Sequence, residues 1–222
     1  MNDYLELRRR GLLFLPFFLA VPLLFGLGFR YAGYSMEWRA FGLGALGWLI
    51  ALMLRGPLAA VLQKRSQETI KRWMIVGSGV FEETVRVIML LLTAVTASWA
   101  VSFGQGWAAI EVLYTMINVA VIASLIGRTD EKAKQAIQYL EQQGTLHASP
   151  LWGILERIWA SAFHIGCTLI AARFPWLVVV LIPLHSGLNA IGVKLAAQAV
   201  WKSSAAICII GVLILIIGIV IQ

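Results

Sequence analysis

Long apolar runs dominate this chain and decide what it can fold into. Of its 222 residues, 60% are hydrophobic and only 13% are charged, unlike a typical soluble domain. An apolar run of about 20 residues is long enough, as a helix, to cross the hydrocarbon core of a bilayer. Every backbone polar group must be satisfied internally there, so the runs are expected to be helical. The sequence therefore predicts an all-α integral membrane protein.

The runs predict a polytopic bundle of about seven transmembrane helices, which we treat as a single integral membrane domain covering residues 1–222. The expected spans are residues 11–29, 41–62, 73–101, 108–127, 151–174, 175–198 and 203–222. Residues 128–150 form the one sizeable polar segment. This segment is expected to be a cytoplasmic connector that contains a short helix.

Lysine and arginine residues are unevenly shared between the two sides of this bundle. Connections on one side hold twelve of them, which are Arg8, Arg9, Arg10, Lys64, Arg65, Lys71, Arg72, Arg128, Lys132, Lys134, Lys194 and Lys202. The other side holds three, which are Arg30, Arg39 and Arg173. Cytoplasmic loops are enriched in such residues, so we expect a cytoplasmic N-terminus and an outside C-terminus, in the cytoplasmic membrane of a bacterium or archaeon. Because the cations lie in short clusters between apolar runs, nucleic acid is not expected as a partner.

Ionisable groups within the spans are the main functional signal, because a charge at the bilayer centre costs about 3 kcal/mol even on lenient scales. The candidate site residues belong to spans 73–101, 151–174 and 175–198, and they are Glu82, Glu83, Arg86, His164, His185 and Asn189. Counting the helical rise from the span ends places Glu82, His164 and His185 near mid-membrane. We therefore expect these three side chains to face a shared cavity.

Other polar residues in the spans are candidates for a supporting role. They are Glu111, Asn118, Glu156 and Arg157, and we expect them to contact the site or to line its cavity. Glu156 and Arg157 could also form a purely structural ion pair. Arg55 precedes Gly56 and Pro57 and is expected to reach the membrane surface or to mark a helix break. Trp107 is expected at a span end, in an aromatic belt.

Three kinds of intramembrane protease are excluded by missing residues. The sequence has no H-E-x-x-H run, which a site-2-like metalloprotease requires. Its only aspartates, Asp3 and Asp130, lie outside the spans, so a presenilin-like aspartyl protease is excluded. The G-x-S-G motif of a rhomboid-like serine protease is also absent, since Val76 takes the place of its first glycine.

A fourth pattern is present. The chain contains the run Gly79-Val80-Phe81-Glu82-Glu83-Thr84-Val85-Arg86, then His164, then His185-Ser186-Gly187-Leu188-Asn189, each in a separate span. This order resembles the glutamate-dependent intramembrane endopeptidases of the CAAX-processing and bacteriocin-processing superfamily (CPBP, or Abi). Within it, the chain is most similar to the YhfC family of membrane peptidases. The resemblance covers residues 77–189, about half of the chain.

The resemblance implies an intramembrane endopeptidase and a role for each site residue. Glu82, helped by His164, would polarise a water molecule that attacks a peptide carbonyl. His185 and Asn189 would donate hydrogen bonds to the developing oxyanion. Glu83, paired with Arg86, would orient the group, although spacing alone does not decide which glutamate is the base. The implied partners are membrane lipid and a membrane-associated or lipidated peptide or protein substrate, with the oligomeric state left open.

This mechanism needs no cofactor, but other interpretations stay open. His164, His185 and one glutamate could instead hold a catalytic zinc ion and leave a position for water. The charge of Arg86 would oppose such a cation, and Asn189 would have no ligand role. A proton-coupled transporter would also place acids and histidines at mid-membrane. A non-catalytic membrane scaffold that keeps the fold is a further alternative.

Overall fold

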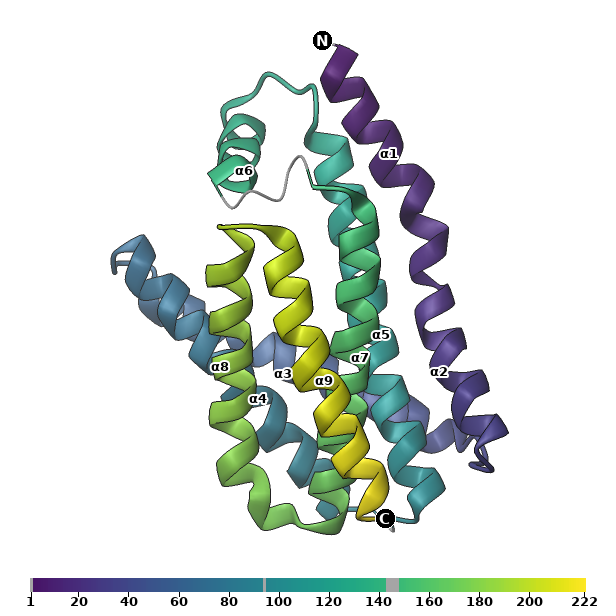
Figure 1. Cartoon of the computed structure of the whole chain (residues 1–222). Helices are drawn as coiled ribbons and strands as arrows, with labels where there is room; N and C mark the ends of the chain where they lie inside the picture. The colour runs from purple at the N-terminus through teal and green to yellow at the C-terminus, as the bar shows by residue number, and fades with distance from the viewer. Residues whose placement is uncertain (1, 94, 143–147) are drawn as a thin grey trace.

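The computed structural model describes residues 2–93, 95–142 and 148–222, and these residues are almost entirely helical (Figure 1). The elements are α1 (Asn2–Phe18), α2 (Ala20–Tyr31), α3 (Trp38–Leu62), α4 (Gln67–Leu91), α5 (Ala97–Leu125), α6 (Glu131–Gln142), α7 (Pro150–Arg173), the 3-10 turn η1 (Pro175–Leu177), α8 (Val178–Ala196) and α9 (Val200–Val220). The predicted all-α class is confirmed.

Long helices run back and forth along the bundle in Figure 1. Within the described residues, six helical runs are long and apolar enough to cross a membrane: Glu6–Tyr31, Trp38–Leu62, Ala97–Leu125, Pro150–Arg173, Pro175–Ala196 and Val200–Val220. The first run joins α1 and α2, which are separated at Leu19. Helix α4 carries too many charged residues to meet the same criterion. It nevertheless has 25 residues, about 37 Å of helix, and packs along α3 and α8. The bundle therefore has about seven crossings, as predicted.

The boundary between the third and fourth crossings differs from the predicted one. Spans were expected at 73–101 and 108–127, whereas α4 ends at Leu91 and α5 begins at Ala97. The side chain of Thr96 caps α5 by accepting a hydrogen bond from the N–H of Trp99 at 3.2 Å. The turn before α5 contains no charged residue and therefore continues the apolar run. For this reason the hydropathy of the sequence does not show where α4 ends.

Residues 102–107 were expected to be a loop but lie within α5. Their glycines are packing positions. A Cβ atom at Gly106 would lie 1.9 Å from the carbonyl oxygen of Phe41, and one at Gly44 would lie 1.9 Å from that of Phe103. Helices α3 and α5 therefore meet at backbone contact, as small residues allow in membrane bundles. Gly106, which could be taken for a turn residue in the sequence, serves this contact instead, and Gly104 packs against Ile165 and Thr168 of α7.

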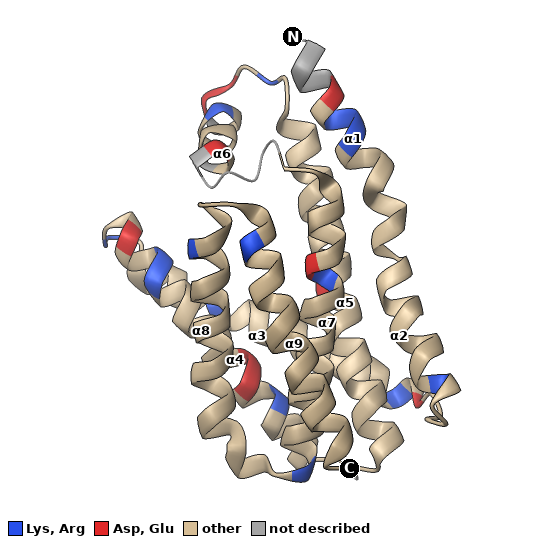
Figure 2. Ribbon diagram, in the orientation of Figure 1, with Lys and Arg blue, Asp and Glu red and all other residues tan. Residues whose placement is uncertain are grey.

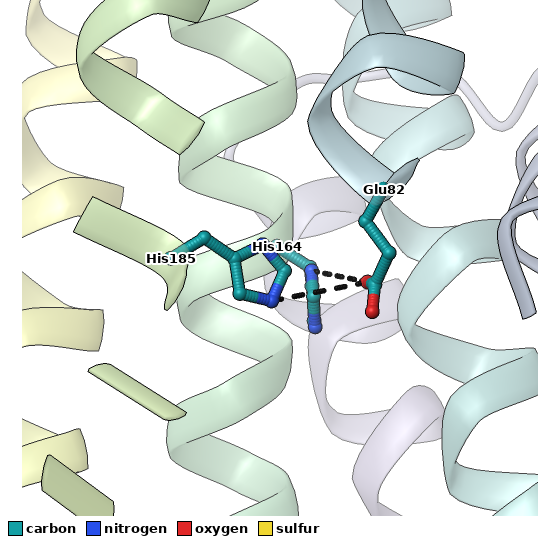
Figure 3. A group of neighbouring side chains, drawn as sticks. All are labelled: Glu82, His164 and His185. Atoms are coloured by element: carbon teal, nitrogen blue, oxygen red, sulfur yellow. Dashed lines mark ion pairs between the residues drawn. The ribbon is translucent and has the colours of Figure 1, made fainter. Parts of the chain in front are cut away.

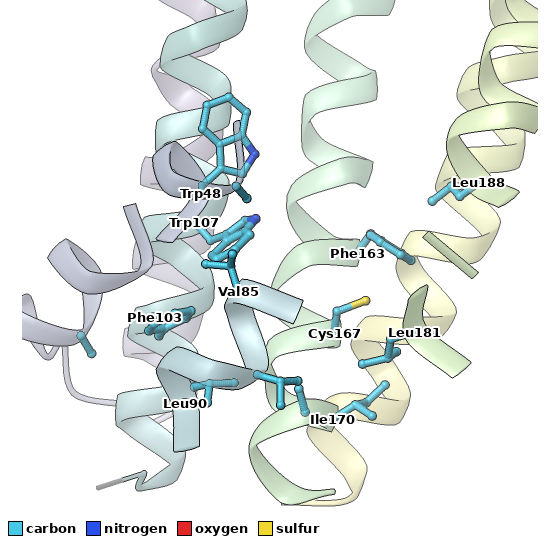
Figure 4. Close-up of a cluster of buried hydrophobic side chains, with 14 residues drawn as sticks. Trp48, Val85, Leu90, Phe103, Trp107, Phe163, Cys167, Ile170, Leu181 and Leu188 are labelled. Carbon is cyan, nitrogen blue, oxygen red and sulfur yellow. The ribbon is translucent and has the colours of Figure 1, made fainter. Parts of the chain in front are cut away.

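An apolar cluster fills the space between α3, α4, α5, α7 and α8 (Figure 4). Its buried members include Trp48, Phe103, Trp107, Phe163 and Leu181. Helix α9 covers α7 at similarly close range, since a Cβ atom at Gly211 would lie 2.3 Å from the carbonyl oxygen of Trp159. This packing fixes α4, α7 and α8, the helices that carry the predicted site residues.

The polar segment 128–150 contains the expected short helix, α6. Asp130 accepts hydrogen bonds from the backbone N–H of Ala133 at 3.2 Å and from Arg128 at 2.8 Å. These bonds lower the pKa of the Asp130 carboxyl, so the cap stays charged at neutral pH. Residues 143–147 of the predicted connector lie outside the described residues. Helix α6 and the start of α1 lie at one end of the bundle, and the C-terminus lies at the other (Figure 1).

Candidate active site

A group of charged residues lies inside the bundle, whereas most others lie near its two ends (Figure 2). Helix α4 contributes Glu82, Glu83 and Arg86, which expose 3%, 0% and 0% of their surface. His164 on α7 and His185 on α8 are each 3% exposed. Burial this complete is costly for ionised groups unless each one has a partner. The hydrogen-bond and ion-pair partners of these five residues therefore indicate what chemistry the site can support.

The carboxylate of Glu82 points toward both imidazole rings (Figure 3). Its Oε2 atom lies 4.0 Å from Nδ1 of His164 and 3.9 Å from Nε2 of His185. One ligand-type atom from each of these residues lies within 4.8 Å of the other two. The structure thus brings together, from three helices, the residues that the sequence placed at one depth.

Each imidazole has a carboxylate behind it. Nδ1 of His185 lies 2.7 Å from Oε1 of Glu83, and Nε2 of His164 lies 2.6 Å from Oε2 of Glu111. An ionised carboxylate only accepts hydrogen bonds, so these two ring nitrogens are the protonated ones. In a neutral ring the other nitrogen is then unprotonated, and in both histidines it is the atom that faces Glu82. Such a carboxylate behind the ring is typical of histidines that bind metal ions.

Arg86 is hydrogen-bonded to several residues around the two histidines. Its guanidinium donates to both oxygens of Glu83, at 3.0 and 3.2 Å, to the carbonyl oxygen of His164 at 3.0 Å and to Oγ1 of Thr168 at 2.6 Å. Its NH2 group also lies 3.0 Å from Nδ1 of His164. Arginine can only donate, which supports a lone pair on that nitrogen. The guanidinium also stacks 4.3 Å from the ring centre of Trp107.

The predicted supporting residues divide into two sets. Glu111 and Arg157 form an ion pair between α5 and α7, and Arg157 also binds Glu156 at 2.8 Å. These three residues therefore connect to the site through the Glu111 to His164 contact. Asn118 is exposed on α5, two turns beyond Glu111, and the structure does not bring it to the group.

Asn189 lies one turn after His185 on α8, as expected from the sequence. Its Nδ2 atom donates to Oγ of Ser78 on α4 at 2.7 Å. This contact ties α8 to α4 one turn before Glu82. The role of Asn189 as an oxyanion donor stays a prediction.

Sequence reasoning missed two residues that contact Glu82. Arg55 of α3 pairs with its Oε1 atom, and Nε1 of Trp107 donates to its Oε2 atom at 3.4 Å. Trp107 was expected in an aromatic belt, yet it is fully buried, because the start of α5 had been placed too late. For Arg55 a signal did exist. It continues the stripe of buried α3 positions Gly44, Trp48 and Ala51 at helical spacing.

The donor set has the residue types of a divalent metal site, but its ligand atoms, which lie within 4.8 Å of one another, would have to move closer to hold an ion. In a tetrahedral zinc site, ligands about 2.1 Å from the ion lie about 3.4 Å from one another. The Glu82 to histidine separations are therefore about half an ångström too long. A cation at this point would also displace the Arg86 contact to Nδ1 of His164. Arg86 would keep its four bonds to Glu83, the His164 carbonyl and Thr168.

Comparison with known families decides the broad class. A family model described as YhfC intramembrane metalloprotease matches residues 17–211. The chain belongs to this YhfC family. The matched range contains Glu82, His164 and His185, so the YhfC resemblance seen in the sequence is confirmed. Searches of curated proteins and of solved structures gave no match.

YhfC membership favours a membrane protease over the transporter and scaffold alternatives. The family description names a metalloprotease, and the buried Glu82, His164 and His185 group could hold a metal ion. The family match does not test the wider relationship to the CPBP superfamily, which stays a prediction. The helices and the family together identify an integral membrane protein whose outer surface contacts lipid.

Proposed function

We propose that this protein is a metal-dependent intramembrane endopeptidase. In this proposal Oε2 of Glu82, Nδ1 of His164 and Nε2 of His185 bind a single divalent ion, most simply zinc. The observation that carries it is the pair of carboxylates behind the rings, because Glu83 and Glu111 each bind the ring nitrogen that faces away from Glu82 and leave the other nitrogen turned toward it. Two histidines and one carboxylate with an open fourth position are the ligand set of several zinc peptidases.

The surrounding residues hold this centre in place. Glu83 fixes the ring of His185, and Glu111 fixes that of His164. Arg86 holds Glu83 in position and balances its charge. When bound, the ion would polarise a peptide carbonyl and lower the pKa of a water molecule. Hydrolysis would add the OH of that water to the carbonyl carbon and its remaining proton to the leaving nitrogen as the C–N bond breaks.

A metal-free mechanism is the second candidate, and one observation favours it. Arg55 and Arg86 already place positive charge beside Glu82 and His164, where a cation would bind. Without an ion, Glu82 itself would take the proton from the attacking water, as the sequence resemblance implied. The metal alternative explains the orientation of both imidazoles, and we therefore favour it.

The substrate is proposed to be a membrane-associated or lipidated peptide segment. The site is formed by helices of a membrane bundle and is almost fully buried. A segment that already partitions into lipid reaches such a site without leaving the apolar phase. We place this activity in the cytoplasmic membrane.

Metal analysis separates the two mechanisms. The protein purified in detergent should contain about one zinc ion per chain, measured by plasma mass spectrometry, and Co²⁺ exchanged into the site should give visible absorption bands. Chelator should abolish cleavage of membrane-anchored reporter peptides, and added Zn²⁺ should restore it. The Glu82→Gln variant should lose both metal and cleavage.

The matched control is Glu68→Gln, on the same helix but in an exposed ion pair with Arg72, and it should behave as wild type. A wild-type protein that cleaves the reporters at an unchanged rate after chelation would instead establish the metal-free mechanism. Loss of cleavage with retained metal in Glu82→Gln would exclude Glu82 as a ligand and leave it as the base.

A further inference from the structure

Among the residues that the structure describes, Arg55 is the one cation outside the predicted motif that contacts Glu82. It comes from α3, and its NH2 group pairs with Oε1 of Glu82. The other oxygen, Oε2, faces the two histidines. The guanidinium therefore lies beside the proposed metal position, on the opposite oxygen of the same carboxylate.

Two further observations show that Arg55 does more than balance a charge. Its Nε atom is buried and has no hydrogen-bond partner. A buried donor without a partner is costly, more so on a charged group, and in a native protein it calls for an explanation such as a catalytic role. The Arg55 side chain is also 23% exposed, against 4% or 5% for Glu82, His164 and His185. A molecule that approaches Glu82 along the α3 side therefore meets Arg55 first.

We propose that Arg55 binds the carbonyl oxygen of the scissile peptide bond, an inference that rests on the proposed peptidase function. In this proposal the Nε–H group of Arg55 donates its hydrogen bond to the carbonyl oxygen of the substrate. During hydrolysis the carbonyl π electrons move onto that oxygen as the water adds, and they return when the C–N bond breaks. A hydrogen-bond donor already positioned beside that oxygen stabilises the negative charge of the tetrahedral intermediate. Substrate therefore enters past the α3 side of the site.

The position of Arg55 on α3 is compatible with binding a substrate carbonyl. Pro57 lies two residues later and has no N–H, so the carbonyl of Met53 loses its ordinary helix partner. Gly56 has open space around it. Helix α3 is therefore less tightly packed at Gly56, next to Arg55, than at its Gly44 contact with α5.

The test uses acetohydroxamate, a small carbonyl compound that binds divalent ions and has no side chain that could select for a subsite. Its binding to the Co²⁺-loaded full-length protein in detergent is followed through the visible spectrum. Arg55→Lys is the decisive variant, because it keeps a positive charge beside Glu82 but removes the Nε–H donor and the planar fork. Arg55→Ala removes both the donor and the charge.

Both variants should bind Co²⁺ within a few-fold of wild type, because Arg55 is not a ligand, and should bind acetohydroxamate about 10- to 100-fold more weakly. Cleavage by Arg55→Ala should be partly restored by added guanidinium, through kcat more than KM. Arg39→Lys, on the same helix but exposed, is the control and should match wild type. Gel filtration and the melting temperature show whether each variant is folded.

Equal hydroxamate affinity in wild type and Arg55→Lys would overturn the proposal, and so would Co²⁺-loaded wild type that fails to bind hydroxamate at all. Failure of the wild-type protein to bind Co²⁺ would instead refute the proposed metal-dependent function. These outcomes separate the role of Arg55 from the presence of the metal site.

Discussion

Glu83 and Glu111 each bind one of the two histidines. They come from different helices, α4 and α5, yet each takes the ring nitrogen that Glu82 does not face. The sequence predicted Glu82, His164 and His185 together, because depth in a membrane can be counted along a helix. It did not reveal which nitrogen of each ring is free, since that depends on contacts between residues far apart in the chain.

Removing the charge of Glu111 should weaken metal binding without removing a ligand. Glu111→Gln keeps an oxygen for Nε2 of His164 but makes the ring a poorer donor to the ion. The affinity for Co²⁺ should fall about 10-fold or more, measured by titration against a competing chelator. Glu156→Gln, which contacts only Arg157 among these residues, should change it less. Equal affinities in the two variants would show that Glu111 does not act through His164.

At the scale of helices, the sequence predicted the number of crossings better than their ends. Because the turn before α5 is uncharged, the predicted third span included the first residues of α5. The start of the next span was therefore predicted too late. Gly104 and Gly106 then fell in the expected loop. Their packing partners, Ile165 of α7 and Phe41 of α3, are about sixty residues away in the chain, so the sequence does not show these contacts. A glycine that opens a turn and one that permits close packing look the same in a sequence.

Two glycines of α3 test this explanation directly. Gly44 leaves no space for a Cβ atom against Phe103, whereas Gly42 has no atom within 4 Å. Gly44→Ala should therefore destabilise the fold by about 1–3 kcal/mol through overpacking, seen as a lower melting temperature in detergent. Gly42→Ala should be neutral or slightly stabilising, since alanine is the better helix former. Similar melting temperatures would mean that the α3 to α5 contact is looser than the structure shows.

Across the whole molecule, the distribution of lysine and arginine residues follows the arrangement of the helix connections. The start of α1, the α3 to α4 connection, α6 and the α8 to α9 connection all lie in the upper half of the bundle as drawn in Figure 1, and they carry or adjoin the twelve cations counted from the sequence. The other end has Arg30, Arg39 and Arg173, at the termini of α2, α3 and α7. We therefore propose that the end with α6 faces the cytoplasm.

Reporter fusions test this orientation. Alkaline phosphatase, which folds only outside the cytoplasm, should be active when fused after Gln222, and a fluorescent protein that folds only inside should be dark there. The reverse should hold for fusions before Met1. Fluorescence from the C-terminal fusion would mean an even number of crossings or the opposite orientation.

The close contact between α7 and α9 has a consequence for biosynthesis. A Cβ atom at Gly166, two residues after His164, would lie 2.5 Å from the carbonyl oxygen of Ile214, so α9 supports α7 directly behind the site. Helix α9 follows every site residue in the chain and leaves the ribosome after them. During synthesis, a chain that has already inserted Glu82, His164 and His185 therefore still lacks the support that aligns them. We therefore expect the site to be aligned only once this later span has docked, so that the proposed cleavage would begin only in the finished chain.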